Sequence, residues 1–180
     1  MGYPAFASGD VLNASDMNAV GLWKIAAGNF STGVTTFDIN DIFSSNYASY
    51  RILFRGIQTS GSNAVNIRFK NSGGTSQTNY SYGGTFRTFA GIAGDNTLNA
   101  GTLWLCCFAS NTNRTSASMD IHNPNTTEFT TFNTMATNFD AGAQNSGIHA
   151  TATAYTGITV LTNSAVTFTA GSYVVYGYRN

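Results

Sequence analysis

Charged side chains are scarce in this sequence. They make up 9% of the 180 residues, against about a quarter in an average soluble domain. The eight basic and eight acidic residues cancel, and the basic ones are scattered between Lys24 and Arg179 without forming a cluster. Surfaces that bind nucleic acid or anionic membranes need an excess of Lys and Arg. We therefore expect neither nucleic acid nor a membrane as a partner.

Long apolar runs are also missing. No stretch of the sequence approaches the roughly 20 apolar residues of a membrane-spanning helix. The first 21 residues, MGYPAFASGDVLNASDMNAVG, have neither the basic start nor the continuous apolar stretch of a secretory signal. We expect a chain that is made in the cytoplasm without a signal peptide.

Cysteine and proline are equally rare, with two of each. Cys106 and Cys107 are neighbours, and a bridge between neighbouring strand residues would be strained. This pair predicts two reduced thiols, at least one of them in the core, rather than a disulfide scaffold or a zinc site. Pro4 and Pro124 both lie outside the predicted strands, so hydrogen-bonded ladders can run without interruption.

Neutral polar residues take the place of charge, because Ser, Thr and Asn together make up roughly a third of the chain. From Leu22 onward the apolar residues recur with period two. Val65, Ile67 and Phe69 share one face of a predicted strand, and polar residues occupy the other face. The strands predicted in this way are 22–27, 33–39, 50–55, 64–70, 78–89, 102–109, 115–122, 128–137, 147–155, 157–162, 165–169 and 172–178.

Short stretches rich in Gly, Asn and Ser separate these strands, including 91–96 and 142–147. Many short strands with regular turn signals and almost no helical periodicity indicate an all-β fold. We expect a jelly-roll-like antiparallel β-sandwich over residues 24–180. An immunoglobulin-like sandwich is less favoured, because the sequence has no Cys…Trp…Cys spacing.

Residues 1–23 differ from the rest and predict a separate N-terminal attachment segment. Ser15 can cap a short helix over 16–20, with Gly21 as its stop. So short a helix cannot be stable alone, and it must pack on its own domain or on another chain. The apolar residues expected to make that contact are Phe6, Val11, Leu12, Met17, Val20, Leu22 and Trp23.

Catalytic motifs are not evident. Asp120 and His122 share a strand face, but no G-x-S-x-G turn marks a nucleophile, and no phosphate-binding loop is present. Asp120, His122 and His149 could hold a metal on a symmetry axis between copies of the chain, although a hydrogen-bonded strand pair is the plainer interpretation. Glu128 is the only glutamate, which makes a carboxylate pair for polysaccharide cleavage improbable. We expect no enzymatic activity, no metal and no cofactor.

An aromatic stretch at 79–89 is the main surface candidate. Tyr80, Tyr82, Phe86 and Phe89 could stack on sugar rings, with Arg87 nearby. The plainer interpretation is a strand or hairpin whose aromatic side chains face the core. The loops expected at 91–101 and 138–147 could contribute to the same glycan contact.

Three stretches resemble surface proteins of tailed bacteriophages. Residues 9–23, GDVLNASDMNAVGLW, resemble an opening frequent in tailed-phage fibre and virion proteins. Residues 43–52, FSSNYASYRI, resemble the start of a β-sandwich in the same proteins, and residues 170–180, AGSYVVYGYRN, are similar to the close of short virion proteins from aquatic phages. Together they cover about a fifth of the chain, and none of them carries catalytic residues.

The resemblance implies a non-enzymatic structural component of a tailed-phage virion, made in the host cytoplasm. It would be an anchored, trimeric appendage such as a tail fibre, an adaptor or a head fibre. Its partners would be copies of itself and other virion proteins of the capsid or tail. Two alternatives stay open: a capsid decoration protein, and an adhesin that binds a carbohydrate of the host surface.

Overall fold

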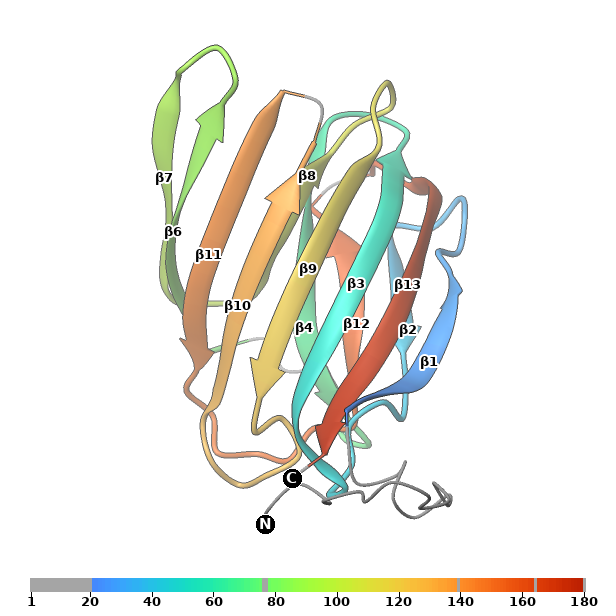
Figure 1. Ribbon diagram of the computed structural model, residues 1–180, viewed down its shortest axis with the longest axis vertical. Coiled ribbons are helices and arrows are strands. Elements are labelled where there is room, and N and C mark those ends of the chain that lie inside the picture. Colours follow the sequence, from blue (N-terminus) through green and yellow to red (C-terminus); the bar gives the residue numbers. More distant parts are fainter. Residues whose placement is uncertain (1–20, 76–77, 139, 164, 180) are drawn as a thin grey trace, which may run out of the picture.

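The computed structural model describes residues 21–75, 78–138, 140–163 and 165–179 (Figure 1). All regular secondary structure in these residues is β-strand. The helix expected at 16–20 lies outside the described residues. The strands are β1 (Leu22–Asn29), β2 (Thr36–Ile39), β3 (Tyr47–Thr59), β4 (Asn63–Asn71), β5 (Gly74–Thr75), β6 (Tyr80–Thr88), β7 (Ala93–Gly101), β8 (Trp104–Ala109), β9 (Thr115–His122), β10 (Thr130–Thr137), β11 (Ala141–His149), β12 (Gly157–Thr162) and β13 (Phe168–Arg179).

These strands form two antiparallel sheets that pack face to face, which confirms the predicted sandwich. The larger sheet has eight strands in the order β1-β13-β3-β9-β10-β11-β6-β7. The smaller has the order β2-β12-β4-β5, and β8 pairs with the start of β4 on the same edge as β5, opposite β12. The described part of the chain contains no helix that is long and apolar enough to cross a membrane.

The connections make the sandwich jelly-roll-like. Consecutive strands stay in one sheet at β4–β5, β6–β7 and β9–β10–β11, whereas every other connection between the described strands crosses from one sheet to the other. The last strand, β13, lies between β1 and β3 and pairs with both. The large sheet is therefore complete only when the two ends of the described chain have come together.

Alternation builds the core. In β10, Thr130, Phe132, Thr134 and Ala136 are buried while the residues between them are exposed. Such a period of two places one row of side chains between the sheets. In β4 the predicted face of Val65, Ile67 and Phe69 is fully buried.

Two strands were not predicted where they occur. β7 begins at Ala93, in a stretch expected to be a turn. A strand was expected at 147–155, but β11 begins earlier, at Ala141, and already ends at His149. Both are rich in Gly, Ala and Asn, which have low intrinsic preference for strands. Their hydrogen bonds to β6 on either side determine their structure. The two strands expected at 165–169 and 172–178 are the single strand β13.

The two ends of the sandwich differ. β1 begins and β13 ends at the same end, where Leu22 pairs with Tyr178. The turn of the β6–β7 hairpin and the β8–β9 and β10–β11 connections lie at the opposite end, at the top of Figure 1. The first described strand therefore begins at the end that is remote from these three connections.

Candidate functional site

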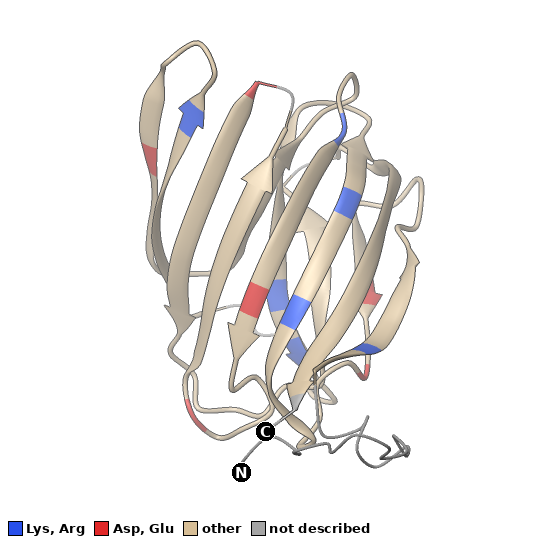
Figure 2. Ribbon diagram, viewed as in Figure 1, with Lys and Arg blue, Asp and Glu red and all other residues tan. Residues whose placement is uncertain are grey.

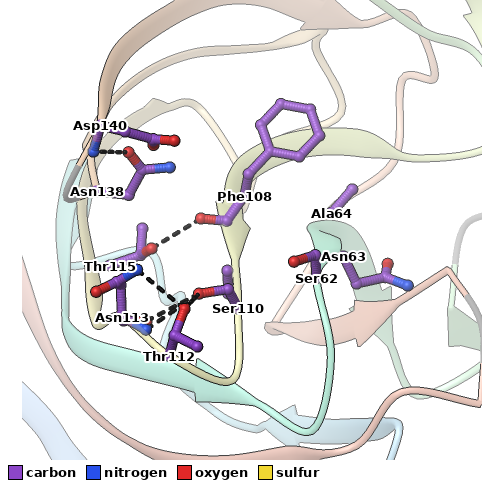
Figure 3. A pocket seen from close by; sticks show the side chains of 11 residues that line it. Ser62, Asn63, Ala64, Phe108, Ser110, Thr112, Asn113, Thr115, Asn138 and Asp140 are labelled. Carbon is purple, nitrogen blue, oxygen red and sulfur yellow. Dashed lines mark hydrogen bonds between the residues drawn. The ribbon is translucent and has the colours of Figure 1, made fainter. Parts of the chain in front are cut away.

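A cleft opens at the end of the sandwich that is remote from Leu22. It consists of two adjoining cavities of about 380 Å³ and 240 Å³, which share Phe108, Thr115, Asn138 and Asp140 as lining residues. Ligand pockets in proteins typically enclose about 300–1,000 Å³. We call these two cavities together the end cleft, and its larger cavity is drawn in Figure 3.

Phe108 is the aromatic side chain between the two cavities. It lies near the end of β8 and is 44% exposed. The Thr115 hydroxyl at the start of β9 donates a hydrogen bond of 2.8 Å to the Phe108 carbonyl oxygen. In the connection between these strands, the Ser110 hydroxyl accepts a hydrogen bond of 3.1 Å from the Asn113 backbone N–H. These bonds order the polar loop beside the ring.

The β10–β11 connection forms the opposite wall. The Asn138 side-chain oxygen accepts hydrogen bonds from the backbone N–H groups of Asp140, at 3.0 Å, and Ala141, at 2.7 Å. Figure 3 shows the Asn138 and Asp140 side chains extending from this wall toward Phe108. The turn therefore fixes an amide beside a carboxylate at the rim of the cleft.

Small residues create the space of the smaller cavity. Ala117, Ala136 and Ala143 stand opposite one another in neighbouring strands, and Ala143 stands opposite Phe86. The row faces inward, between the sheets. Larger side chains in this row would fill the space between Phe86 and Phe108. The smaller cavity thus depends on the small size of Ala136 and Ala143, which line it.

The residues predicted to contact a glycan do not lie together. Tyr80 is fully buried, and its hydroxyl oxygen accepts a hydrogen bond of 2.7 Å from the Phe69 backbone N–H. Tyr82 is half-buried against the core. Phe86 lines the end cleft, whereas Arg87 points to the other face of the sheet, as the alternation of β6 requires. Of the four, only Phe86 has a place in this cleft.

The proposed loops around that stretch also need correction. Residues 93–101 and 141–147 belong to strands β7 and β11, so they are not loops. Asn138 and Asp140 line the end cleft. Phe108, which sequence reasoning assigned only to a strand, is the main residue that it missed. The feature of the sequence that could have indicated its exposure is its position just before the polar stretch 110–114.

The candidate metal ligands lie on opposite faces. Asp120 and His122 are on the outer face of the large sheet, whereas His149 is fully buried between the sheets. Asp120 accepts two hydrogen bonds of 2.7 Å from the Arg51 guanidinium, and His122 Nδ1 lies 2.9 Å from the Ser49 hydroxyl. These three residues therefore cannot hold one ion within a chain. The described residues contain no other cluster of three metal-ligating side chains.

The two cysteines are free and buried, as predicted. The pairing of β4 with β8 shifts register between Val65 and Asn66, where β8 carries the extra residue Cys106. Contact with the Cys107 thiol, together with burial, raises the pKa of Cys106 well above its ordinary value. A protonated, buried thiol is a poor nucleophile.

His149 makes a testable contribution to stability. It packs among the rings of Phe69, Tyr80 and Tyr155. Burial lowers the pKa of His149, and backbone hydrogen bonds that raise it compensate only in part. In the unfolded chain the residue binds a proton near its ordinary pKa of about 6.5, whereas the folded chain binds one only at lower pH. The unfolded state therefore binds more protons in this pH range, and the stability of the folded state decreases as the pH falls.

We therefore expect the melting temperature of the protein to fall between pH 7.5 and pH 5.0, and to fall less in His149→Phe. Differential scanning calorimetry at several pH values measures both slopes. Comparing slopes removes any constant effect of the substitution on packing. An unchanged slope in His149→Phe would contradict the assignment.

The outer face of the large sheet is broad and almost uncharged. Arg51 and Asp120 pair directly across β3 and β9. Figure 2 shows the remaining charges on this sheet as isolated positions. Met135 on β10 is 65% exposed and lines a shallow pocket of about 270 Å³ with Gln144 and Arg87. The face therefore offers mainly neutral polar groups around one apolar side chain, with Arg87 as the charged residue beside it.

The expected docking residues fall into two groups. Phe6, Val11, Leu12, Met17 and Val20 lie outside the described residues. Leu22 and Trp23 are part of β1, so the sandwich begins two residues before the expected boundary at residue 24. Leu22 is 43% exposed at the edge of the sheet.

Comparison with known proteins does not assign the chain to a family. No family model and no curated protein matches the chain. A solved structure of the infectious bursal disease virus Gx strain aligns with 13% identity, covering 89% of this chain and 39% of that chain, with a TM-score of 0.10. So weak a likeness does not support an argument about fold or function.

Proposed function

We propose that this chain is a non-enzymatic structural component of a tailed-phage virion, an anchored surface appendage of the fibre or adaptor type. The three stretches that resemble such proteins support this, and so does the all-β sandwich. The observation on which the proposal mainly depends is the layout. The N-terminal segment joins one end of the sandwich at Leu22, and the end cleft opens at the other.

This layout suits a protein that is attached at one end and makes contacts at the other. A ring or tail of copies anchored through residues 1–20 would present the β6–β7, β8–β9 and β10–β11 connections outward. A capsid decoration protein would have the same orientation, attached at one end of the sandwich and exposed at the other. The proposal covers both locations, and the appendage is the form we favour.

Purified particles test the location. An antibody against the sandwich should label the virion surface in electron micrographs, and mass spectrometry should find the chain in washed particles. A chain lacking residues 1–20, which leaves β1 intact, should fold but no longer attach to the particle. Absence of the chain from particles would refute the proposal, and attachment of the truncated chain would refute the anchor.

We further propose that the chain assembles as a homotrimer through the outer face of the large sheet. Identical copies repel least where their surfaces carry little net charge, and on this face Arg51 is neutralised by Asp120. Exposed Met135 on β10 offers an apolar contact on this face. Light scattering coupled to size-exclusion chromatography should therefore report three copies.

A charge at Met135 tests this interface. Met135→Asp should give a folded monomer, because an unpaired carboxylate is costly to bury in an interface. Ile92→Asp is the matched control: Ile92 is equally exposed, at 65%, but lies in the hairpin turn away from this face. A trimer that survives Met135→Asp, or a monomeric wild-type protein, would exclude the interface.

A further inference from the structure

We infer that the end cleft is a binding site for a neutral saccharide. The inference goes beyond the proposed function, because it concerns the isolated chain and holds whether or not the chain is part of a particle. It also differs from the glycan contact expected at Tyr80, Tyr82 and Arg87, since none of these lines the cleft.

The first argument is the pairing of apolar and polar walls. Phe108 offers an exposed ring face, and Phe86 with Ala136, Ala141 and Ala143 lines the smaller cavity. The larger cavity is lined mainly by small polar side chains. A sugar ring has an apolar C–H face and a rim of hydroxyl groups, so it suits a site with one aromatic platform and several short hydrogen-bonding groups.

The second argument is the hydrogen-bonding capacity at the rim. Both bonds to the Asn138 side chain go to its oxygen, which leaves its NH₂ group as a donor. The Asp140 carboxylate beside it is an acceptor, and within the described residues no side chain or backbone group is bonded to it. A donor and an acceptor side by side match vicinal hydroxyl groups, each of which can both donate and accept.

The third argument is charge. Asp140 is the only ionisable side chain among the residues that line the two cavities. Without a lysine or arginine the cleft has no group to neutralise a uronate, a sialate or a phosphate, and Asp140 would repel them. The expected ligand is therefore an uncharged hexose or N-acetylhexosamine unit of an oligosaccharide.

A peptide is a poorer fit for the strand next to the cleft. An extended peptide binds by adding to a free strand edge, and β8 is at the edge of the small sheet. However, Asn145 on β11 already donates a hydrogen bond of 3.3 Å to the Leu105 carbonyl of β8. Side chains of the large sheet thus cover part of this edge.

A glycan array tests the ligand class with the full chain. It should carry neutral hexose oligomers, N-acetylhexosamine oligomers, and uronic and sialic acid oligomers. We expect binding to one or more neutral or N-acetylated structures and none to the acidic ones. Binding to acidic glycans alone, to protein alone or to no glycan would overturn the inference.

Two substitutions then locate the site, using the best-bound oligosaccharide in isothermal titration calorimetry. Phe108→Ala should weaken binding about tenfold or more, because it removes the aromatic platform. Phe129→Ala should leave binding unchanged, since Phe129 is also exposed, at 52%, but precedes β10 at the opposite end of the sandwich. Equal effects of the two substitutions would contradict the site.

Hydrogen exchange on the wild-type chain gives a second readout that needs no variant. The bound oligosaccharide should slow exchange in residues 108–115 and 140–143 and leave residues 123–129 unchanged. Protection outside the end cleft would overturn the inference even if Phe108→Ala failed to fold. Because these experiments use the purified chain, their failure is distinct from absence of the chain from the virion.

Discussion

Phe69→Ala is expected to lower the free energy of unfolding by about 3–5 kcal/mol. Phe69 is fully buried in β4. Its ring centroid lies 5.2 Å from that of Tyr155, 6.0 Å from that of Tyr80 and 5.5 Å from the His149 ring. Truncation would remove the ring around which these three residues pack and leave a cavity between the sheets.

Urea-induced unfolding followed by tryptophan fluorescence measures this loss. Phe89→Ala is the matched control, because Phe89 is 70% exposed in the β6–β7 connection. Its substitution should change stability by less than about 0.5 kcal/mol. If the two variants unfolded at the same urea concentration, Phe69 would not be part of the core that holds the sheets together.

Gly84→Ala is expected to destabilise the protein by about 3 kcal/mol through crowding between β6 and β11. A Cβ atom at this position would lie 2.1 Å from the Gln144 carbonyl oxygen and 2.2 Å from the Asn145 side-chain oxygen. The contact with the Gln144 backbone cannot be relieved by a rotamer change, so the strands must separate. Because β6 carries Phe86, the same substitution should also disturb the end cleft.

Gly83→Ala provides the comparison on the adjacent residue. A Cβ atom there meets no atom within 4 Å, and alanine reduces the freedom of the unfolded chain. Gly83→Ala should therefore be neutral or stabilising by up to about 1 kcal/mol. Thermal unfolding of the two variants measures the difference, and Gly84→Ala should have the lower melting temperature. Similar melting temperatures would show that β6 can move away from β11 without loss.

Contacts of β8 hold the small sheet over the strands that form the end cleft. β8 packs over β10, β11 and β6, whereas the aromatic cluster around Phe69 joins the sheets farther from the cleft, at the start of β6 and the end of β11. Trp104 at the start of β8 stacks on Phe132 of β10, with ring centroids 3.9 Å apart. The cleft can therefore be preformed, which limits the entropy lost when a ligand binds.

The proposed roles require no reacting group. Within the described residues, the ionisable side chains either pair with one another, as Arg51 does with Asp120, or stand apart. A surface with few charges and many hydroxyl and amide groups can bind neutral partners through short hydrogen bonds. That character is shared by the outer face of the large sheet and by the end cleft, and it links the composition to both proposals.

The amino-acid sequence by itself determined the fold class. Alternation such as that of Val65, Ile67 and Phe69 specifies which side of a strand is buried, because successive side chains point to opposite faces. The adjacent cysteines could be read as free thiols from the geometry of neighbouring residues alone. These inferences depend only on local spacing, and the structure confirms them.

Tertiary structure decided the rest. β7 and β11 have the composition of turns, and they are strands because β6 pairs with them. Asn66 was expected on a solvated face, but it is buried and bonds to Asn163 at 2.6 Å. The smaller cavity of the end cleft depends on the register that places Ala136 opposite Ala143. Register, strand neighbours and the covering of each face are set by contacts between distant parts of the chain, which local spacing does not encode.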